Sequence, residues 1–220
     1  MTGSRHPLAV IGRRAVIGGL VAGAALAQGT DPRGNAPRGD DPQAVIRTFL
    51  SALETTVRGG EARPFRQRFD QLAPAVDRSF DLTTILSVSV GARWASFAEG
   101  VRTELGGVFR TYTVASYVAN FATFDGAAFE MEAETRASGA DQVVRTRIVP
   151  RSGDSRRLDY VMRQAEAGWR VVDVLADGTI SRVAVQRSDF RSLLGRDGNT
   201  AALLDSLRRK ITELSGGALG

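Results

Sequence analysis

The sequence predicts an α+β domain in which an antiparallel sheet of about five strands has helices packed on one face. Apolar residues recur every three or four positions from residue 42 to about 121, which is the spacing of amphipathic helices. From about residue 129 to 174 they alternate with polar residues, as in strands with one buried face. Because helices precede and follow the strands instead of alternating with them, we expect one antiparallel sheet covered on one side.

The first two helices are predicted from their apolar faces and their end signals. Asp41 provides an N-cap and Pro42 the first helical residue, and two glycines at 59–60 end this helix. A second helix, at about residues 62–72, is expected to stop before Pro74, since proline removes a backbone donor and clashes with the preceding turn. The apolar face of the first helix is formed by Val45, Ile46, Phe49, Leu50, Leu53 and Val57.

Two more helices are expected before the sheet. A short helix follows the N-cap Asp81 and ends near Gly91. Residues 96–99, Ser-Phe-Ala-Glu, have the pattern of a capping box, which predicts that a longer helix opens there and continues toward Phe121.

The strands are predicted from the alternating pattern and the glycine-containing turns between its segments. They are expected at residues 129–135, 142–150, 157–163 and 169–174, with the second arm of a hairpin at 180–185. Asp177-Gly178 supplies the hairpin turn. Beyond the sheet, Ser188 is expected to cap a short helix, and Asn199-Thr200 a last helix that ends at Gly216-Gly217.

The N-terminus has the features of an export signal. Three arginines precede a small-residue apolar run without charge, and Ala25-Leu26-Ala27 is a suitable cleavage site. Residues 1–27 are therefore predicted to be a cleaved signal peptide, and Arg13-Arg14 also resembles the twin-arginine type. Residues 28–41, rich in glycine, proline and charge, are expected to be a disordered leader. Residues 42–215 are expected to form a single domain.

Composition excludes several classes of function. The chain has no cysteine, and its one histidine, His6, lies in the predicted signal, so disulfides, thiolate nucleophiles, serine–histidine triads and common zinc sites are excluded from the mature domain. Removing the three arginines of residues 1–27, a segment without acidic residues, lowers the net charge from +5 to +2. A nucleic-acid partner is therefore not expected. An enzyme built from this domain would have to use carboxylates, tyrosine, arginine or lysine.

Two groups of carboxylates are candidate sites with simpler structural interpretations. Glu130, Glu132 and Glu134 alternate along one strand and could bind a metal, but cross-strand ion pairs with arginines on a solvated face explain them more simply. Asp173 and Asp177 could be an acid/base pair. The favoured interpretation is structural for both: Asp177 forms a turn with Gly178, and Asp173 is a half-buried carboxylate with an arginine partner.

The apolar and aromatic residues of the helices and of one sheet face are the candidate lining of a ligand pocket. An ordinary core would show the same pattern, since a domain of this size needs a core. The candidate lining residues are Phe80, Ile85, Val90, Trp94, Phe97, Val108, Phe109, Tyr112, Tyr117, Phe121, Met131, Val144, Ile148, Tyr160, Met162, Val172 and Val174.

An ordered set of short motifs resembles one family of proteins. Trp-Arg-Val-Val-Asp-Val at 169–174 is followed by Asp-Gly-Thr-Ile-Ser at 177–181 and Gln-Arg-Ser-Asp-Phe at 186–190, and Val-Gly-Ala-Arg-Trp stands upstream at 90–94. With these motifs, nearly all of residues 42–215 resembles the MlaC, or toluene-tolerance auxiliary, family. Residues 177–190 are most similar to its hopanoid-associated HpnM branch.

The resemblance implies a periplasmic lipid carrier without enzymatic activity or cofactor. It implies an apolar pocket between helices and sheet for a phospholipid or hopanoid-type lipid, shuttled between the inner and outer membranes. The implied partners are an inner-membrane ABC transporter complex and an outer-membrane lipoprotein complex. Arg182 or Arg187 would then meet the headgroup phosphate.

Two other classes of function stay open at this point. One is a small cone-shaped α+β enzyme acting on an apolar molecule, with Asp173 or Tyr160 as its acid or base. The other is an interaction module for an inner-membrane transporter, with no cargo of its own.

Overall fold

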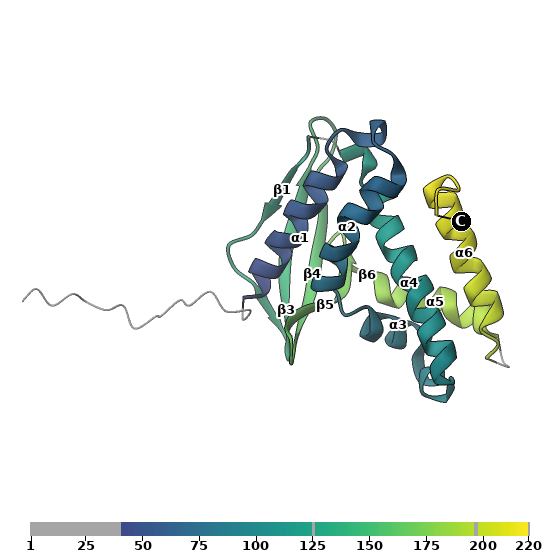
Figure 1. Cartoon of the computed structure of the whole chain (residues 1–220). Helices are drawn as coiled ribbons and strands as arrows, with labels where there is room; N and C mark the ends of the chain where they lie inside the picture. Colours follow the sequence, from purple (N-terminus) through teal and green to yellow (C-terminus); the bar gives the residue numbers. More distant parts are fainter. Residues whose placement is uncertain (1–40, 125, 196–197, 220) are drawn as a thin grey trace, which may run out of the picture. The chain divides into compact units, whose positions relative to one another are not determined.

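The computed structural model describes residues 41–219 except 125 and 196–197, and it confirms the α+β class. Four α-helices precede a six-stranded antiparallel sheet in this part of the chain, and two follow it (Figure 1). The predicted signal peptide, and the predicted leader up to residue 40, lie outside the described residues. Across the described ranges, no helix combines the length and apolar character needed to cross a membrane.

The elements follow one another in simple order. The helices before the sheet are α1 (Pro42–Val57), α2 (Phe65–Ser79), α3 (Leu82–Val90) and α4 (Glu99–Asn120). The strands are β1 (Ala128–Met131), β2 (Arg136–Ser138), β3 (Asp141–Val149), β4 (Arg156–Ala165), β5 (Gly168–Ala176) and β6 (Ile180–Ser181). The last two helices are α5 (Arg182–Leu194) and α6 (Ala201–Ser215), and short 3-10 turns lie at Gly60–Ala62, Gly91–Ser96 and Ala122–Phe124.

The sheet has the strand order β1-β3-β4-β5-β6, and β2 also pairs with β3. The predicted strand 129–135 is in fact two short strands, since the chain leaves the ladder after Met131 and returns as β2. The side-chain amide of Gln43, in the first turn of α1, donates to the carbonyls of Glu132 and Ala133 at 2.8 and 3.0 Å. These carbonyls are thus satisfied by the helix, so the strand can break at this point.

A β-bulge in β5 decides which residues face the helices. The register between β4 and β5 shifts so that Val174 lies opposite Tyr160 and Val171 lies opposite Met162. The prediction that Val172 faces the helices is therefore wrong, because Val171 takes the inward position and packs into the core. The backbone of Asp81 donates to the Val171 carbonyl at 2.9 Å, which joins the start of α3 to the sheet.

On the opposite face of the sheet, ion pairs connect neighbouring strands. Arg145 pairs with Glu132 at 2.6 Å, which confirms the cross-strand interpretation for this glutamate. Arg163 of β4 pairs with Asp141 of β3 at 2.7 Å. Within β4, the guanidinium of Arg157 pairs with the fully buried carboxylate of Asp159 at 2.7 Å.

The helices form layers on one face of the sheet. α1, α2, α3 and α5 all contact β5, and α1 also contacts β1 and β3. α4 packs against α2 and α3, and α6 packs against α4 and α5. Figure 1 shows α6 on the side of α4 that points away from the sheet.

Two of the boundaries predicted for the helices before the sheet are wrong. α2 passes through Pro74 and ends at Ser79, because Pro74 is exposed and removes one helical bond while Ala75 and Val76 beyond it are buried. α4 begins at Glu99 instead of opening at a capping box, since the Ser96 hydroxyl donates to the Arg93 carbonyl in the preceding turn.

An aromatic cluster joins α1, the end of α2, α4 and β4. The Phe49 ring meets the rings of Phe80, Tyr117 and Tyr160 edge-to-face, with centroids 5.1, 5.2 and 6.0 Å apart. Phe49 and Tyr160 are both fully buried. Edge-to-face pairs of this kind contribute about 0.5–1.5 kcal/mol each beyond the apolar area that they bury.

We expect Phe49→Ala to lower the free energy of unfolding by about 3–5 kcal/mol, because it removes a buried ring and leaves a cavity at the centre of the cluster. Urea denaturation followed by circular dichroism would measure this. Thr48→Ala, at the exposed neighbour on the same helix, should stay within about 0.5 kcal/mol of the parent. Equal losses for the two variants would show that the cluster is not a stabilising centre.

Candidate functional site

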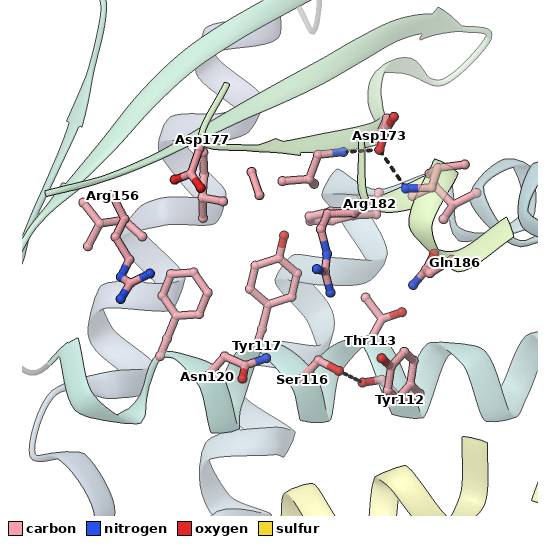
Figure 2. A pocket seen from close by; sticks show the side chains of 18 of the residues that line it. Tyr112, Thr113, Ser116, Tyr117, Asn120, Arg156, Asp173, Asp177, Arg182 and Gln186 are labelled. Atoms are coloured by element: carbon pink, nitrogen blue, oxygen red, sulfur yellow. Dashed lines mark hydrogen bonds between the residues drawn. The ribbon is translucent and has the colours of Figure 1, made fainter. Parts of the chain in front are cut away.

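A cavity of about 580 Å³ lies between α4 and the sheet. Its walls come from α3, from α4 and the turn after it, from β3, β4 and β5, and from the first turn of α5. Figure 2 shows α4 along one side with the sheet opposite, and side chains from both reaching into the space between.

The deeper walls of the cavity are apolar. α4 presents Phe109 and Tyr117, Phe80 stands at the end of α2, and Ile148 and Val174 come from the sheet. These side chains are buried or half-buried, so they remove apolar surface from water whether or not a ligand is present. Apart from the Tyr117 hydroxyl, such walls offer a long hydrocarbon body burial and no directed polar contact.

The rim of the cavity is polar and carries arginine side chains that have no carboxylate partner among the described residues. Arg156, Arg182, Asn120 and Asp177 line the cavity and are exposed. Arg156 and Arg182 form no ion pair with any carboxylate in the part of the chain that the structure describes, whereas Arg157 is engaged by Asp159. In Figure 2 the guanidiniums of Arg156 and Arg182 point into the cavity on either side of Tyr117. The rim can therefore offer positive charge to an anionic group.

Asp173 fixes the start of α5 beside the cavity. Its carboxylate accepts from the backbone nitrogens of Val174 and Val183 at 2.7 and 3.1 Å, and the Ser181 hydroxyl also donates to it. The same hydroxyl accepts from the Ala184 nitrogen at 2.9 Å as the N-cap. A negative charge at this end also suits the helix dipole.

This arrangement corrects three predictions. The carboxylate of Asp173 is held by a serine and backbone amides instead of an arginine partner. The hairpin arm expected at 180–185 is limited to Ile180 and Ser181, and α5 begins at Arg182, so Ser188 is inside the helix and not its cap. The cap at Ser181 depends on a strand residue eight positions earlier, which local patterns do not reveal. The predicted turn at Asp177 is confirmed, with this residue at a φ of 52°.

Two tyrosines meet at the inner wall. Burial raises the pKa of Tyr160, and proximity of the Tyr117 hydroxyl partly offsets this. Burial also raises the pKa of Tyr117 well above its ordinary value, the Tyr160 hydroxyl adds to this, and the charge of Arg182 opposes it. Both hydroxyls therefore keep their protons well into the alkaline range.

The structure brings eight of the seventeen predicted lining residues to the cavity. These are Phe80, Ile85, Phe109, Tyr112, Tyr117, Phe121, Ile148 and Val174. The other nine lie outside its lining: Val90, Trp94, Phe97, Val108, Met131, Val144, Tyr160, Met162 and Val172. Val144, Tyr160 and Met162 are fully buried core residues, and Trp94 borders a separate hollow between α3 and the N-terminal half of α4, with Leu86 and Arg102. Apolar spacing alone does not distinguish core from cavity wall.

Sequence reasoning missed the polar part of the lining. Thr113, Ser116 and Asn120 follow Phe109 and Tyr117 along one face of α4, at intervals of three or four residues. This helical spacing could have found them, but a search restricted to apolar residues excluded them. Arg156 and Gln186 reach the cavity only through the folding of β4 and α5, and no local pattern marks them.

The geometry thus defines a class of protein. It is a small α+β domain in which helices cover one face of the sheet, and an apolar cavity with a cationic rim lies between the helices and the sheet. A family model described as MlaC protein matches residues 43–209, and the chain belongs to this family. A solved structure described as the phospholipid-binding protein from Ralstonia solanacearum in complex with a phospholipid has the same fold. The two chains share 18% sequence identity with a TM-score of 0.69, covering 80% of this chain and 99% of that one. No curated protein matches the chain.

The raised tyrosine pKa values predict a loss of stability in alkali. In the unfolded chain tyrosines ionise near pH 10, while the folded chain keeps Tyr160 protonated, so the stabilisation is complete below pH 10 and lost as the pH rises further. Each such tyrosine steepens the fall by up to about 1.4 kcal/mol per pH unit. Tyr160→Phe should therefore show a shallower fall above pH 10 in urea denaturation. Identical slopes for the parent and the variant would contradict the assignment.

Proposed function

We propose that this protein is a non-enzymatic periplasmic carrier that holds a phospholipid or hopanoid-type lipid in the cavity below α4. In this proposal it shuttles the lipid between the inner and outer membranes. An ABC transporter complex at the inner membrane and a lipoprotein complex at the outer membrane are its proposed partners. Membership of the MlaC family supports this role, as does the predicted export signal.

The observation that carries the proposal is the cavity itself, with apolar walls and a cationic rim. Burial of each methylene contributes about 0.8 kcal/mol, so about ten methylenes contribute about 8 kcal/mol. This is of the same order as the estimated loss of translational and rotational freedom on association, about 4–15 kcal/mol. A longer acyl tail therefore gives net binding without help from any cofactor.

The rim suits the phosphate of a lipid headgroup. Arg156 and Arg182 point into the cavity without a carboxylate partner among the described residues, and arginine suits phosphate because its planar guanidinium binds two oxygens at once (Figure 2). With its tail against the aromatic wall, the lipid would leave its headgroup at the solvent edge. The protein from Ralstonia solanacearum, with the same fold, is described in complex with a phospholipid.

The geometry does not favour the enzyme alternative. The carboxylate of Asp173 already accepts three hydrogen bonds, one from the adjacent Val174 amide and two from Ser181 and Val183 at the start of α5, so it is a structural group. Tyr160 is fully buried outside the cavity lining, and its raised pKa opposes ionisation. Neither residue is placed as a free acid or base beside a substrate.

A bulky side chain inside the cavity should exclude the lipid. Ser116 lies on α4 and lines the cavity, so we expect Ser116→Trp to abolish copurification of lipid in native mass spectrometry of the purified protein. Ser192→Trp, at an exposed position of α5, is the matched control and should retain the lipid. A parent protein that yields no lipid and cannot be loaded with one would overturn the carrier proposal.

Charge reversal at the rim should weaken binding of an anionic phospholipid. Charge-assisted hydrogen bonds contribute about 1.5–3 kcal/mol, so Arg182→Glu or Arg156→Glu should reduce the affinity for phosphatidylglycerol about tenfold or more. Competition against a fluorescent fatty-acyl probe would measure it. Arg66→Glu, an exposed residue of α2, is the control for net charge. If all three variants bind equally, the rim arginines do not contact the headgroup.

A further inference from the structure

Behind the cavity wall, in the core, lies a hydroxyl that the fold leaves unsatisfied. Tyr160 is fully buried, and its hydroxyl oxygen has no hydrogen-bond partner of acceptable geometry among the described residues. A buried polar group without a partner destabilises the folded state, because it has lost its hydrogen bonds to water. Such a group in a native structure needs an explanation, and one explanation is a ligand that completes the arrangement.

The Tyr117 hydroxyl lies between the buried Tyr160 hydroxyl and the cavity. The Tyr117 and Tyr160 rings both pack edge-to-face on Phe49, with centroids 5.2 and 6.0 Å from its ring, each hydroxyl influences the pKa of the other, and Tyr117 lines the cavity. The hydroxyls of Thr113 and Ser116 on the same wall donate to the carbonyls of Phe109 and Tyr112 at 2.9 and 2.8 Å. The hydroxyls of Thr113 and Ser116 are thus already hydrogen-bonded to the backbone of α4. In the described part of the chain, no such backbone bond holds the hydroxyls of the two tyrosines.

The pair lies beside the proposed phosphate position. The charge of Arg182 acts on Tyr117, and Figure 2 shows the guanidinium next to the tyrosine hydroxyl. In a glycerophospholipid the atoms next to the phosphate are the glycerol carbons and their ester groups. An ester carbonyl accepts hydrogen bonds and donates none, so it matches a hydroxyl that has a proton to give.

We propose that Tyr117 donates a hydrogen bond to an ester carbonyl of the bound lipid, with Tyr160 behind it as a positioning residue, so that this chain selects ester-linked acyl lipids. This rests on the proposed lipid-carrier function. In the proposed complex the Tyr160 hydroxyl donates to the Tyr117 oxygen, and the Tyr117 proton goes to the ester carbonyl. A hopanoid skeleton is a hydrocarbon at the corresponding depth and would offer the Tyr117 hydroxyl no acceptor. Between the two lipid classes, the subsite thus favours the glycerolipid.

The test compares two phospholipids that differ only in their linkage. Delipidated protein is titrated, in competition with a fluorescent fatty-acyl probe, with diacyl phosphatidylglycerol and with the ether-linked analogue of the same chain length. One hydrogen bond of about 1 kcal/mol makes the parent prefer the ester lipid about fivefold. Tyr117→Phe should bring this ratio to about one.

Tyr160→Phe separates positioning from packing. An apolar ring of the same shape removes the unsatisfied hydroxyl, so the thermal stability should be unchanged or higher, while the ester-to-ether ratio should fall. A purely structural Tyr160 predicts an unchanged ratio. Thr111→Ala removes a hydroxyl of α4 that lies outside the cavity lining and donates to the Gly107 carbonyl, and it should keep the ratio of the parent.

The outcomes distinguish this inference from the proposed function. Equal affinity of the parent for the ester and ether lipids overturns the ester subsite and leaves the carrier intact. A preference that persists in both Tyr117→Phe and Tyr160→Phe also overturns it. Failure of the parent to bind either lipid overturns the carrier, and the subsite with it.

Discussion

The packing of Tyr117 against Phe49 and Phe80 is the contact on which the rest of the structure depends. On one side, Tyr117 belongs to the aromatic cluster that joins α1, the end of α2 and α4 above the sheet. On the other side it is part of the cavity wall. α4 is therefore anchored over the sheet by a ring large enough to hold it at a distance. Smaller side chains would let the helix settle onto the sheet and fill the space with an ordinary core.

A second constraint is the set of hydrogen bonds by which Asp173 places the start of α5 beside the cavity. Asp173 lies next to the bulge at Val172 in β5, and it holds the first turn of α5 by accepting hydrogen bonds from the Ser181 hydroxyl and the Val183 amide. This brings Arg182 and Gln186 to the cavity, although they follow the last strand in sequence. The carboxylate that suggested catalysis in the sequence is thus the joint between sheet and helix. A charged group in an MlaC-type domain can be essential for the architecture of a site without taking part in chemistry.

The cavity also explains why polar groups occur among apolar ones. Thr113 and Ser116 return their hydroxyls to the helix backbone, so they line the space without demanding a partner. The buried Tyr160 hydroxyl next to Tyr117 has no partner among the described residues. The wall thus combines non-directional burial with a small polar region near the rim. This arrangement suits an amphiphile, since the apolar walls bury its tail and the polar groups can form hydrogen bonds with its polar end.

The sequence by itself determined the α+β class, the order of the helices and strands, and the positions of most turns, because periodicity and capping residues act over a few neighbours. About half of the apolar residues that it marked as candidate lining do line the cavity, since α4 and the sheet present apolar faces to each other. Only the tertiary structure decided that Val171 replaces Val172 on the inner face, that α5 begins at Arg182, and that Tyr160 is core while Tyr117 borders a cavity. These outcomes depend on contacts between residues distant in sequence, and on the space that large rings leave between two layers, which no local pattern records.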